Sequence, residues 1–302
     1  MKFSILLNNY NYGRYLGAAI ESVLNQTHAD FELMVVDDGS TDDSRSVIAS
    51  FRDARIVPIL KENGGQASTF KAGFARATAD YIAFLDADDL WDSTKLQRCS
   101  EVLSREPDIV LLNHRYRYIA GTTEPEPTPA PTETTPSGIY DLRADLRQHS
   151  TNLKLAPTSF LIGRLQECRQ LQFDEKAWRI AADTPVIVGL ALRGKVYNLS
   201  DVLGSYRIHG SNLWSGRTAR EQTAQLPPDP HPASVKGIEN PIYHHHQRLY
   251  RLANEEQARL GFKERFDFFK TDLALSYRIL CTSRYSPQGI YWRLAKRLRR
   301  NA

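Results

Sequence analysis

Three carboxylates lie within four residues, directly after a short apolar segment. Residues 81–85 are typical of a buried strand, and Asp86, Asp88 and Asp89 follow it. Because an unpaired buried carboxylate is very costly, the cluster is expected at the open end of that strand. Mg²⁺ and Mn²⁺ commonly bridge one or two carboxylates to a phosphate, and strand alternation lets Asp86 and Asp88 project to the same side. The pattern predicts a metal site; the alternative is an acidic turn that leads into a helix capped at Asp92.

Two further polar clusters follow apolar segments near the N-terminus. Residues 8–11 can hydrogen-bond to a nucleotide base, and Tyr10 among them can stack on it. In residues 37–40, Asp37 or Asp38 can accept the imide N–H of uracil, a donor that cytosine and adenine lack. The two clusters indicate a nucleotide site. The alternative for residues 37–40 is a turn held by local hydrogen bonds of an aspartate side chain.

The elements that must position these clusters alternate regularly along the first third of the chain. Apolar segments of strand length are separated by segments whose apolar residues recur at helical spacing. The predicted strands are 3–7, 31–36, 55–60, 81–85 and 108–112, and the predicted helices are 14–26, 43–51, 66–77 and 93–105. This order predicts an α/β fold with a Rossmann-like, mostly parallel sheet and flanking helices. Ligands of such sheets bind beyond the carboxyl ends of the strands, where all three clusters are expected.

The rest of the chain is less regular. Residues 121–137, rich in Thr, Pro and Glu, predict a flexible loop that either folds over an acceptor or is simply solvated. The elements predicted after it are a strand at 158–162, a helix at 184–193 and short strands at 196–199 and 203–208.

The same patterns predict how the chain divides into domains. We expect one domain over 1–214, with a nucleotide-binding half at 1–112 and an acceptor half at 139–214. A linker and a helical C-terminal extension are expected over 215–302, because a second Pro-rich stretch precedes an apolar and charged helical pattern.

Composition excludes several classes of protein. The 302 residues carry a net charge of only +4, which gives no reason to expect nucleic acid as a partner. Cys99, Cys168 and Cys281 are far apart and have no metal-ligand or disulfide spacing, which fits a reducing compartment. We see neither a run of about 18 apolar residues nor a signal-peptide pattern, so a cytoplasmic location is expected. The glycine-rich loop of dinucleotide oxidoreductases and the lysine loop of P-loop kinases are also absent.

Five ordered motifs together resemble family 2 of the glycosyltransferases. They are Asn9-Tyr10-Asn11, residues 22–27 (SVLNQT), residues 35–42 (VVDDGSTD), residues 63–66 (NGGQ) and residues 84–89 (FLDADD). The resemblance is strong over about residues 2–110 and continues weakly to about residue 214. It implies a GT-A fold, an inverting and hexosyltransferase-like reaction, a nucleotide-sugar donor with uridine as the nucleoside, and Mn²⁺ or Mg²⁺ as the cofactor.

Matching the motifs residue by residue assigns the donor site. By this resemblance Tyr10, next to Asn9, would flank the uracil ring, and Asp38 would accept its N3–H. Asn63 and Gln66 would lie near the nucleotide.

The same matching assigns the residues near the diphosphate. Asp86 and Ala87 would lie near the ribose, and Asp88 would be the main protein ligand of the metal, assisted by Asp86. Three basic residues complete this part of the prediction: Lys71 and Arg207 would meet phosphate, and His209 would bind the metal or a phosphate.

An inverting transfer also needs a general base for the acceptor hydroxyl. By resemblance, that base is an acidic residue that opens a helix after the mid-chain strands. Asp183, which precedes Thr184 and Pro185, is therefore the candidate. The alternative is that Asp183 only caps the helix, since Asp before Thr-Pro suits a helix start.

Two further expectations concern partners and rival functions. The basic and apolar segment 290–302 predicts either peripheral contact with an anionic membrane, where lipid-linked acceptors reside, or a helix docked on the protein itself. The expected acceptor is a carbohydrate or lipid-linked hydroxyl, in bacterial surface polysaccharide or glycolipid synthesis at the inner face of the plasma membrane. The rival functions are a nucleotidyltransferase and a catalytically silent sugar-nucleotide-binding protein.

Overall fold

A computed structural model describes residues 1–120, 136–140, 156–172, 175, 178–180 and 182–209. All of these residues belong to one compact unit. Most of the predicted loop 121–137 and the predicted extension 215–302 lie outside the described residues, so their organisation stays a prediction.

A single sheet runs through the described part of the chain. Its strands are β1 Phe3–Asn9, β2 Phe31–Asp38, β3 Ile56–Lys61, β4 Tyr81–Asp86, β5 Leu90–Trp91, β6 Ile109–Ala120, β7 Gly138–Tyr140, β8 Leu161–Arg164 and β9 Lys195–Ile208. Their order is β3-β2-β1-β4-β8-β6-β9-β5, with β7 paired to β9. The neighbours among β1 to β4 are parallel, as is the β6–β9 pair. The pairs made by β8, β5 and β7 are antiparallel. The sheet is therefore wholly parallel in the N-terminal half and mixed beyond it.

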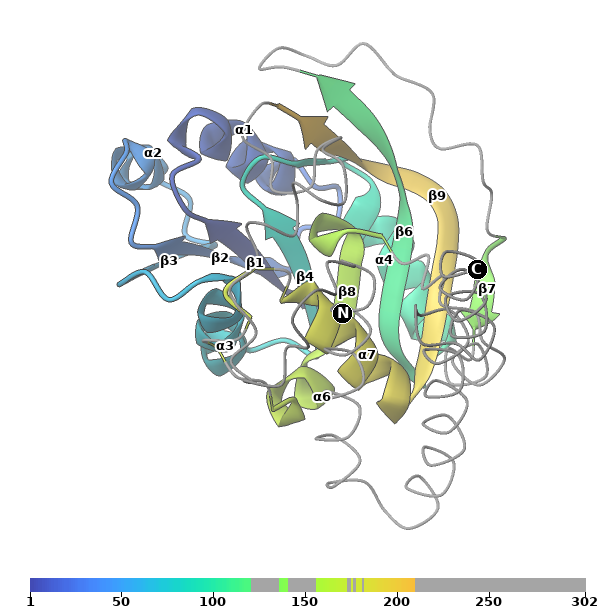
Figure 1. Cartoon of the computed structure of the whole chain (residues 1–302). Coiled ribbons are helices and arrows are strands. Elements are labelled where there is room, and N and C mark those ends of the chain that lie inside the picture. Colours follow the sequence, from blue (N-terminus) through green and yellow to red (C-terminus); the bar gives the residue numbers. More distant parts are fainter. Residues whose placement is uncertain (121–135, 141–155, 173–174, 176–177, 181, 210–302) are drawn as a thin grey trace, which may run out of the picture. The chain divides into compact units, whose positions relative to one another are not determined.

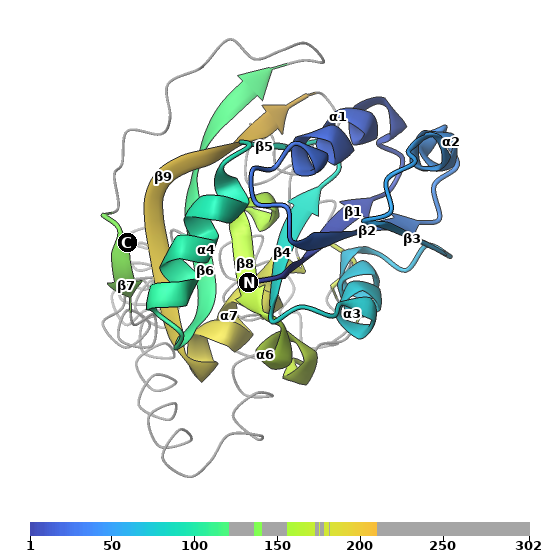
Figure 2. The ribbon, with the colours of Figure 1, turned by 180° about the vertical axis from the view of Figure 1, so that it is seen from behind.

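Helices cover both faces of the sheet (Figures 1 and 2). Their bounds are α1 Gly13–Leu24, α2 Ser44–Ser50, α3 Gln66–Arg76, α4 Lys95–Arg105, α6 Leu165–Gln170 and α7 Asp183–Arg193, with a short 3₁₀ helix, η1, at Thr158–Phe160. Helices α1 and α4 lie on one face, and α3, α6 and α7 lie on the other. The result is the predicted α/β arrangement of a central sheet between two helical layers.

Alternation along β1 explains how both layers attach. Ile5 and Leu7 join the core that contains Leu16 of α1 and Leu96 of α4. Leu6 points to the other face, where a Cβ added to Gly73 of α3 would lie only 2.1 Å from its Cδ1. Because both faces are buried, these strands are almost continuously apolar.

The described elements differ from the predicted ones mainly in the second half. The strand predicted at 108–112 extends to Ala120, and the strands predicted at 196–199 and 203–208 are one strand, β9. These two long strands pair with each other, with shifts in register that accommodate irregular residues. The strand predicted at 158–162 is divided into η1 and β8. Pairing partners distant in sequence decide these lengths, so local periodicity does not reveal them.

Among the described residues, no helix is long and apolar enough to cross a membrane.

Candidate active site

The carboxyl ends of adjacent parallel strands bring the predicted polar clusters together. In register, Asn9 of β1 lies beside Asp37 of β2, and Asn8 lies beside Asp86 of β4. The Asn8 amide donates from Nδ2 to Asp86 Oδ1 at 3.1 Å. The expectation that the three clusters meet at one edge of the sheet is confirmed.

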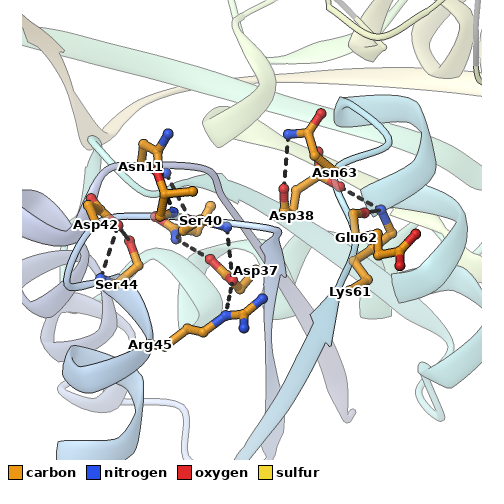
Figure 3. A network of polar contacts seen from close by, with 12 residues as sticks. Asn11, Asp37, Asp38, Ser40, Asp42, Ser44, Arg45, Lys61, Glu62 and Asn63 are labelled. Carbon is orange, nitrogen blue, oxygen red and sulfur yellow. Dashed lines mark hydrogen bonds and ion pairs between the residues drawn. The ribbon is translucent and has the colours of Figure 1, made fainter.

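Asp37 holds the turn that follows β2 (Figure 3). Its buried carboxylate accepts hydrogen bonds from Asn9 Nδ2 at 2.9 Å, from the Ser40 backbone N–H at 3.2 Å and from Arg45 Nε at 3.1 Å. The alternative of a turn held by an aspartate therefore describes Asp37. The Asn9 amide nitrogen also donates to Ser40 Oγ at 3.1 Å, so the buried Asn9 side chain faces this turn.

Asp38 points the other way, toward the segment that leads into α3 (Figure 3). Its carboxylate accepts from the backbone N–H groups of Gly64 at 2.9 Å and Gly65 at 2.7 Å, and from Lys61 Nζ at 2.5 Å. A carboxylate has about four acceptor positions, so these bonds leave capacity for a base N–H. Tyr10, the predicted partner of the base, is 46% exposed.

Asn63 and Gln66 connect this nucleotide half to the segment before α7. Asn63 Nδ2 donates to the Asp38 carbonyl at 2.9 Å, and its Oδ1 accepts from the guanidinium of Arg179. Gln66 Oε1 accepts from the Ala182 N–H at 2.8 Å, and its Nε2 reaches Asp86 Oδ1 at 3.5 Å. Gln66 thus links the end of β4 to the residue that precedes the predicted base.

The three carboxylates at the end of β4 and in the turn that follows have different surroundings. Asp88 Oδ2 lies 3.0 Å from His209 Nε2. Asp89 is buried, and its two oxygens accept from Ser159 Oγ at 2.5 Å and from the Arg207 backbone N–H at 2.8 Å. Asp89 therefore ties this acidic turn to η1 and β9, and metal binding by Asp86 and Asp88 stays a prediction.

Ser159 has a central position that the sequence did not indicate. Besides donating to Asp89, its hydroxyl accepts from the Asp86 backbone N–H at 3.0 Å. Its carbonyl accepts from Trp91 Nε1 at 2.8 Å and from the buried Lys95 Nζ at 2.9 Å.

Helix α4 starts at Lys95 with Thr94 at its N-cap, so the alternative of a helix capped at Asp92 is not observed.

Asp183 is the first residue of α7 and lies in the same acidic site. Gln66 connects this helix start to Asp86: its side chain accepts from the N–H of Ala182, the residue before Asp183, and its Nε2 reaches Asp86 Oδ1. The N-cap position is Ala182, and among the described residues α7 has no side-chain capping bond. Asp183 Oδ1 accepts from the adjacent Thr184 N–H at 2.9 Å. The Asp183 side chain thus satisfies a free N–H in the first turn of α7, as a capping group would, and its role as the general base stays a prediction.

Burial and mutual repulsion control the protonation of these carboxyls. Burial, followed by the charge of Asp88, raises the pKa of Asp86 from 3.8 to about 7. The same two causes raise the pKa of Asp89 well above its ordinary value, and burial raises that of Asp183. A bound cation would relieve this repulsion, because an opposite charge favours the ionised form.

Arg207 and His209 lie at the end of β9, beside aromatic rings of the first helix. The buried Arg207 donates from Nε to the Asp88 carbonyl at 2.8 Å, and its guanidinium carbon is 5.2 Å from the centre of the Tyr15 ring. The His209 imidazole stacks on the same ring at 4.8 Å. Tyr12 is near too: burial and the charges of Asp88 and Asp86 raise its pKa. Neither tyrosine was identified from the sequence: Tyr15 belongs to an ordinary helical pattern, and Tyr12 stands just before that helix.

Lys71 is placed differently from the other predicted residues. It lies on α3, and its Nζ is 3.2 Å from a carboxylate oxygen of Glu175. Its predicted contact with a phosphate stays a prediction.

The side chains of this site could coordinate a divalent cation only together with oxygen atoms of a bound substrate. In the described part of the chain, no three His, Cys, Asp or Glu side chains converge closely enough to hold a metal. Mg²⁺ usually takes one or two carboxylates and completes its coordination with phosphate and water oxygens. Asp88 and Asp86, with His209 beside them, match that smaller number.

Sequence comparisons find related glycosyltransferases. Residues 4–163 match the family described as Glycosyl transferase family 2. An uncharacterized glycosyltransferase of Nostoc sp. is 42% identical over 287 residues, which are 92% of this chain and 81% of the relative. The Escherichia coli UDP-Glc:alpha-D-GlcNAc-diphosphoundecaprenol beta-1,3-glucosyltransferase WfgD is 40% identical over 95 residues, 31% of this chain and 38% of its own. The chain therefore aligns with less than half of WfgD.

Comparison with solved structures identifies the fold. The crystal structure of Staphylococcus aureus TarS residues 1–349 in complex with UDP-GlcNAc has a TM-score of 0.66 and 17% sequence identity. The match covers 94% of this chain and 74% of TarS 1–349. The predicted GT-A fold class is confirmed.

Proposed function

Because this chain belongs to glycosyltransferase family 2, we propose that it transfers a sugar from a UDP-linked donor to a hydroxyl acceptor, with inversion at the anomeric carbon. The observation that carries the proposal is the link that Gln66 makes between Asp86 and Ala182, the residue before Asp183, at the sheet edge that also presents Asp38 and Tyr10. This edge thus combines groups that can bind a nucleobase, groups that can bind a diphosphate, and a carboxylate that can act as the general base.

The mechanism assigns a role to each group. Tyr10 stacks on uracil and Asp38 accepts its N3–H. Asp183 accepts the proton of the acceptor hydroxyl as the hydroxyl oxygen bonds to the anomeric carbon. The bond from that carbon to the diphosphate oxygen breaks, and its electron pair leaves with the UDP. The raised pKa of Asp183 makes it a stronger base than an exposed aspartate.

A divalent cation, Mn²⁺ or Mg²⁺, is part of the proposal. Asp88 and Asp86 would hold it, with His209 in reach of the same position. When bound, it supplies positive charge for the departing diphosphate. The guanidinium of Arg207, beside the Asp88 carbonyl, adds a second positive charge at this end of the site.

The names of relatives support the donor and the setting. WfgD is named for a UDP-glucose donor and a lipid-diphosphate acceptor, and another relative, from Bacillus subtilis, is named as a putative teichuronic acid biosynthesis glycosyltransferase. We therefore propose a role in surface polysaccharide or glycolipid synthesis, with a carbohydrate or lipid-linked acceptor. A nucleotidyltransferase is disfavoured because residues 8–13 contain no basic phosphate loop. A silent binding protein is disfavoured because it needs no general base.

The test separates binding from turnover. Wild type, Asp88→Ala, Asp183→Asn and the surface control Asp201→Asn are compared by calorimetry with UDP and Mn²⁺, and by UDP release from a panel of UDP-sugars with sugar acceptors. We expect Asp88→Ala to lose Mn²⁺-dependent binding. Asp183→Asn should bind normally but turn over about 10²- to 10⁴-fold more slowly, because the base is lost. Full turnover by Asp183→Asn would remove the base assignment.

A further inference from the structure

Four aromatic residues form a cluster on the strands that extend past the acidic turn. Tyr116 and Tyr118 lie on one face of β6, and Tyr118 is the register neighbour of Tyr206 on β9. The ring of Phe160, from η1, stacks on Tyr116 with a centroid distance of 4.5 Å and an interplanar angle of 3°. The centre of the Tyr206 ring is 6.0 Å from those of both Tyr116 and Tyr118.

This aromatic cluster adjoins the base and the acidic turn. Phe160 belongs to the same three-residue η1 turn as Thr158, whose hydroxyl hydrogen-bonds to Asp183, and Ser159, which donates to Asp89. Tyr206 is close enough to Asp89, Asp88 and Asp86 for their charges, after burial, to raise its pKa. The cluster therefore starts where the acceptor hydroxyl must be presented to Asp183.

The chemistry of the cluster fits a sugar ring. The three tyrosines are each partly exposed, so part of each side chain remains accessible to a ligand. A pyranose has apolar C–H faces and a rim of hydroxyls, which matches an aromatic surface carrying polar handles. Phenol hydroxyls can donate to and accept from sugar hydroxyls, and Tyr116 and Tyr118 place their oxygens 3.5 Å apart.

We propose that Tyr116, Tyr118 and Tyr206, supported by Phe160, bind the acceptor's pyranose ring next to Asp183. The proposal rests on the proposed function and adds the class of acceptor: a glycoside whose reactive sugar is a neutral pyranose. The donor sugar is the other possible occupant of the cluster, and the test distinguishes the two.

The experiment measures acceptor and donor constants separately. Wild type and Ala and Phe variants at positions 116, 118 and 206 are assayed for UDP release with a UDP-sugar, Mn²⁺ and a panel of p-nitrophenyl pyranosides. We expect Tyr206→Ala and Tyr118→Ala to raise the KM for the pyranoside at least tenfold. The Phe variants, which keep the ring, should change it less than about threefold. Donor hydrolysis without acceptor should keep its KM for the UDP-sugar in every variant.

Two controls make each outcome decisive. Tyr140→Ala removes a partly exposed tyrosine from β7, which pairs with the other end of β9, and should leave both constants unchanged. Circular dichroism and thermal melting identify any Ala variant that fails to fold, and at that position a Leu variant, which removes the ring but keeps apolar bulk, replaces it with the same expected rise in KM. An unchanged pyranoside KM in the Ala variants, a raised donor KM, or a wild type that hydrolyses donor but uses no pyranoside would each overturn the acceptor proposal. Absence of UDP binding would instead contradict the proposed function.

Discussion

At the scale of single residues, neighbouring aspartates have different hydrogen-bond partners and therefore different roles. Asp37 accepts hydrogen bonds from Ser40 and Arg45 and so holds the turn after β2. Its neighbour Asp38 accepts instead from the backbone N–H groups of Gly64 and Gly65, just before α3. The same division separates Asp89 from the other carboxylates after β4. Adjacent residues in a strand or turn point in different directions, so each meets a different set of partners.

The raised pKa of Asp86 leads to a prediction about stability. The unfolded carboxyl has a pKa near 3.8, and the folded one has a pKa of about 7. Between these values the folded state binds a proton that the unfolded state has released, so the stability of the protein without metal falls as pH rises from about 4 to 7. Asp86→Asn keeps an acceptor for Asn8 and removes this loss. We expect the variant to exceed wild type by up to a few kcal/mol at pH 8, and to match it near pH 4.

Thermal melting in EDTA at pH 5 and pH 8 measures this difference. A gain of a few kcal/mol corresponds to a rise of several degrees in melting temperature for a domain of this size. Asp201→Asn, on the surface, should show no comparable dependence on pH. If Asp86→Asn does not raise the melting temperature more at pH 8 than at pH 5, then ionisation of the buried Asp86 beside Asp88 does not limit the stability of the protein.

At the scale of elements, a tight backbone contact joins the start of α3 to the segment that precedes α7. Gly65, just before α3, has a φ of +86°, and a Cβ at this position would lie 2.6 Å from the Arg179 Cα. The next backbone N–H, from Gln66, donates to the Arg179 carbonyl at 2.9 Å. This contact aligns the segment that ends at Asp183 with the end of β4.

Replacing that glycine should disturb both stability and catalysis. Gly65→Ala combines an unfavourable φ with a clash against backbone, so we expect a loss of about 1–3 kcal/mol in unfolding free energy. Turnover should also fall, because the Gln66 bond to Ala182 shifts together with Arg179. Gly17→Ala in α1 is the matched control: its new Cβ would meet only Val47, at 3.8 Å, and should be neutral or slightly stabilising. Urea unfolding and UDP release compare the two, and equal stability of both variants would contradict the argument.

At the scale of the whole molecule, the two halves of the sheet divide the work. The parallel half supplies Tyr10, Asp38 and Asp86, and the mixed half supplies Asp183, Arg207 and the aromatic cluster. Strand β8 pairs with β4 of the first half and with β6 of the second, and η1, which precedes it, carries Ser159. The junction of the halves is thus also the place where the proposed donor and acceptor meet.

Residues 290–302 lie outside the described residues, and their contact with an anionic membrane stays a prediction. If it forms a basic amphipathic helix, electrostatic attraction and buried apolar side chains should draw the protein to anionic lipid. Deleting these residues is expected to reduce co-sedimentation with phosphatidylglycerol vesicles severalfold at low salt. Turnover with a water-soluble acceptor should not change. Equal sedimentation of the full and truncated chains would favour a helix docked on the protein itself.

The sequence alone was sufficient for the parallel half and for most candidate residues there. Strands β1, β2 and β4 are buried on both faces, so their apolar runs are almost unbroken, and each ends in a polar cluster within one or two residues. The resemblance to the family then added Asn63, Gln66 and Lys71. It also added Asp183, Arg207 and His209, which no local pattern connects to Asp86.

Tertiary structure decided everything that depends on partners far apart in the chain. It showed β9 as one strand, assigned Asp37 and Asp89 to structural hydrogen bonds, and revealed Ser159 and the aromatic cluster. The physical reason is that periodicity reports only which face of an element is buried. The direction of a carboxylate, and the ring against which a tyrosine packs, depend on atoms supplied by strands and turns that are distant in sequence and adjacent only in the folded sheet.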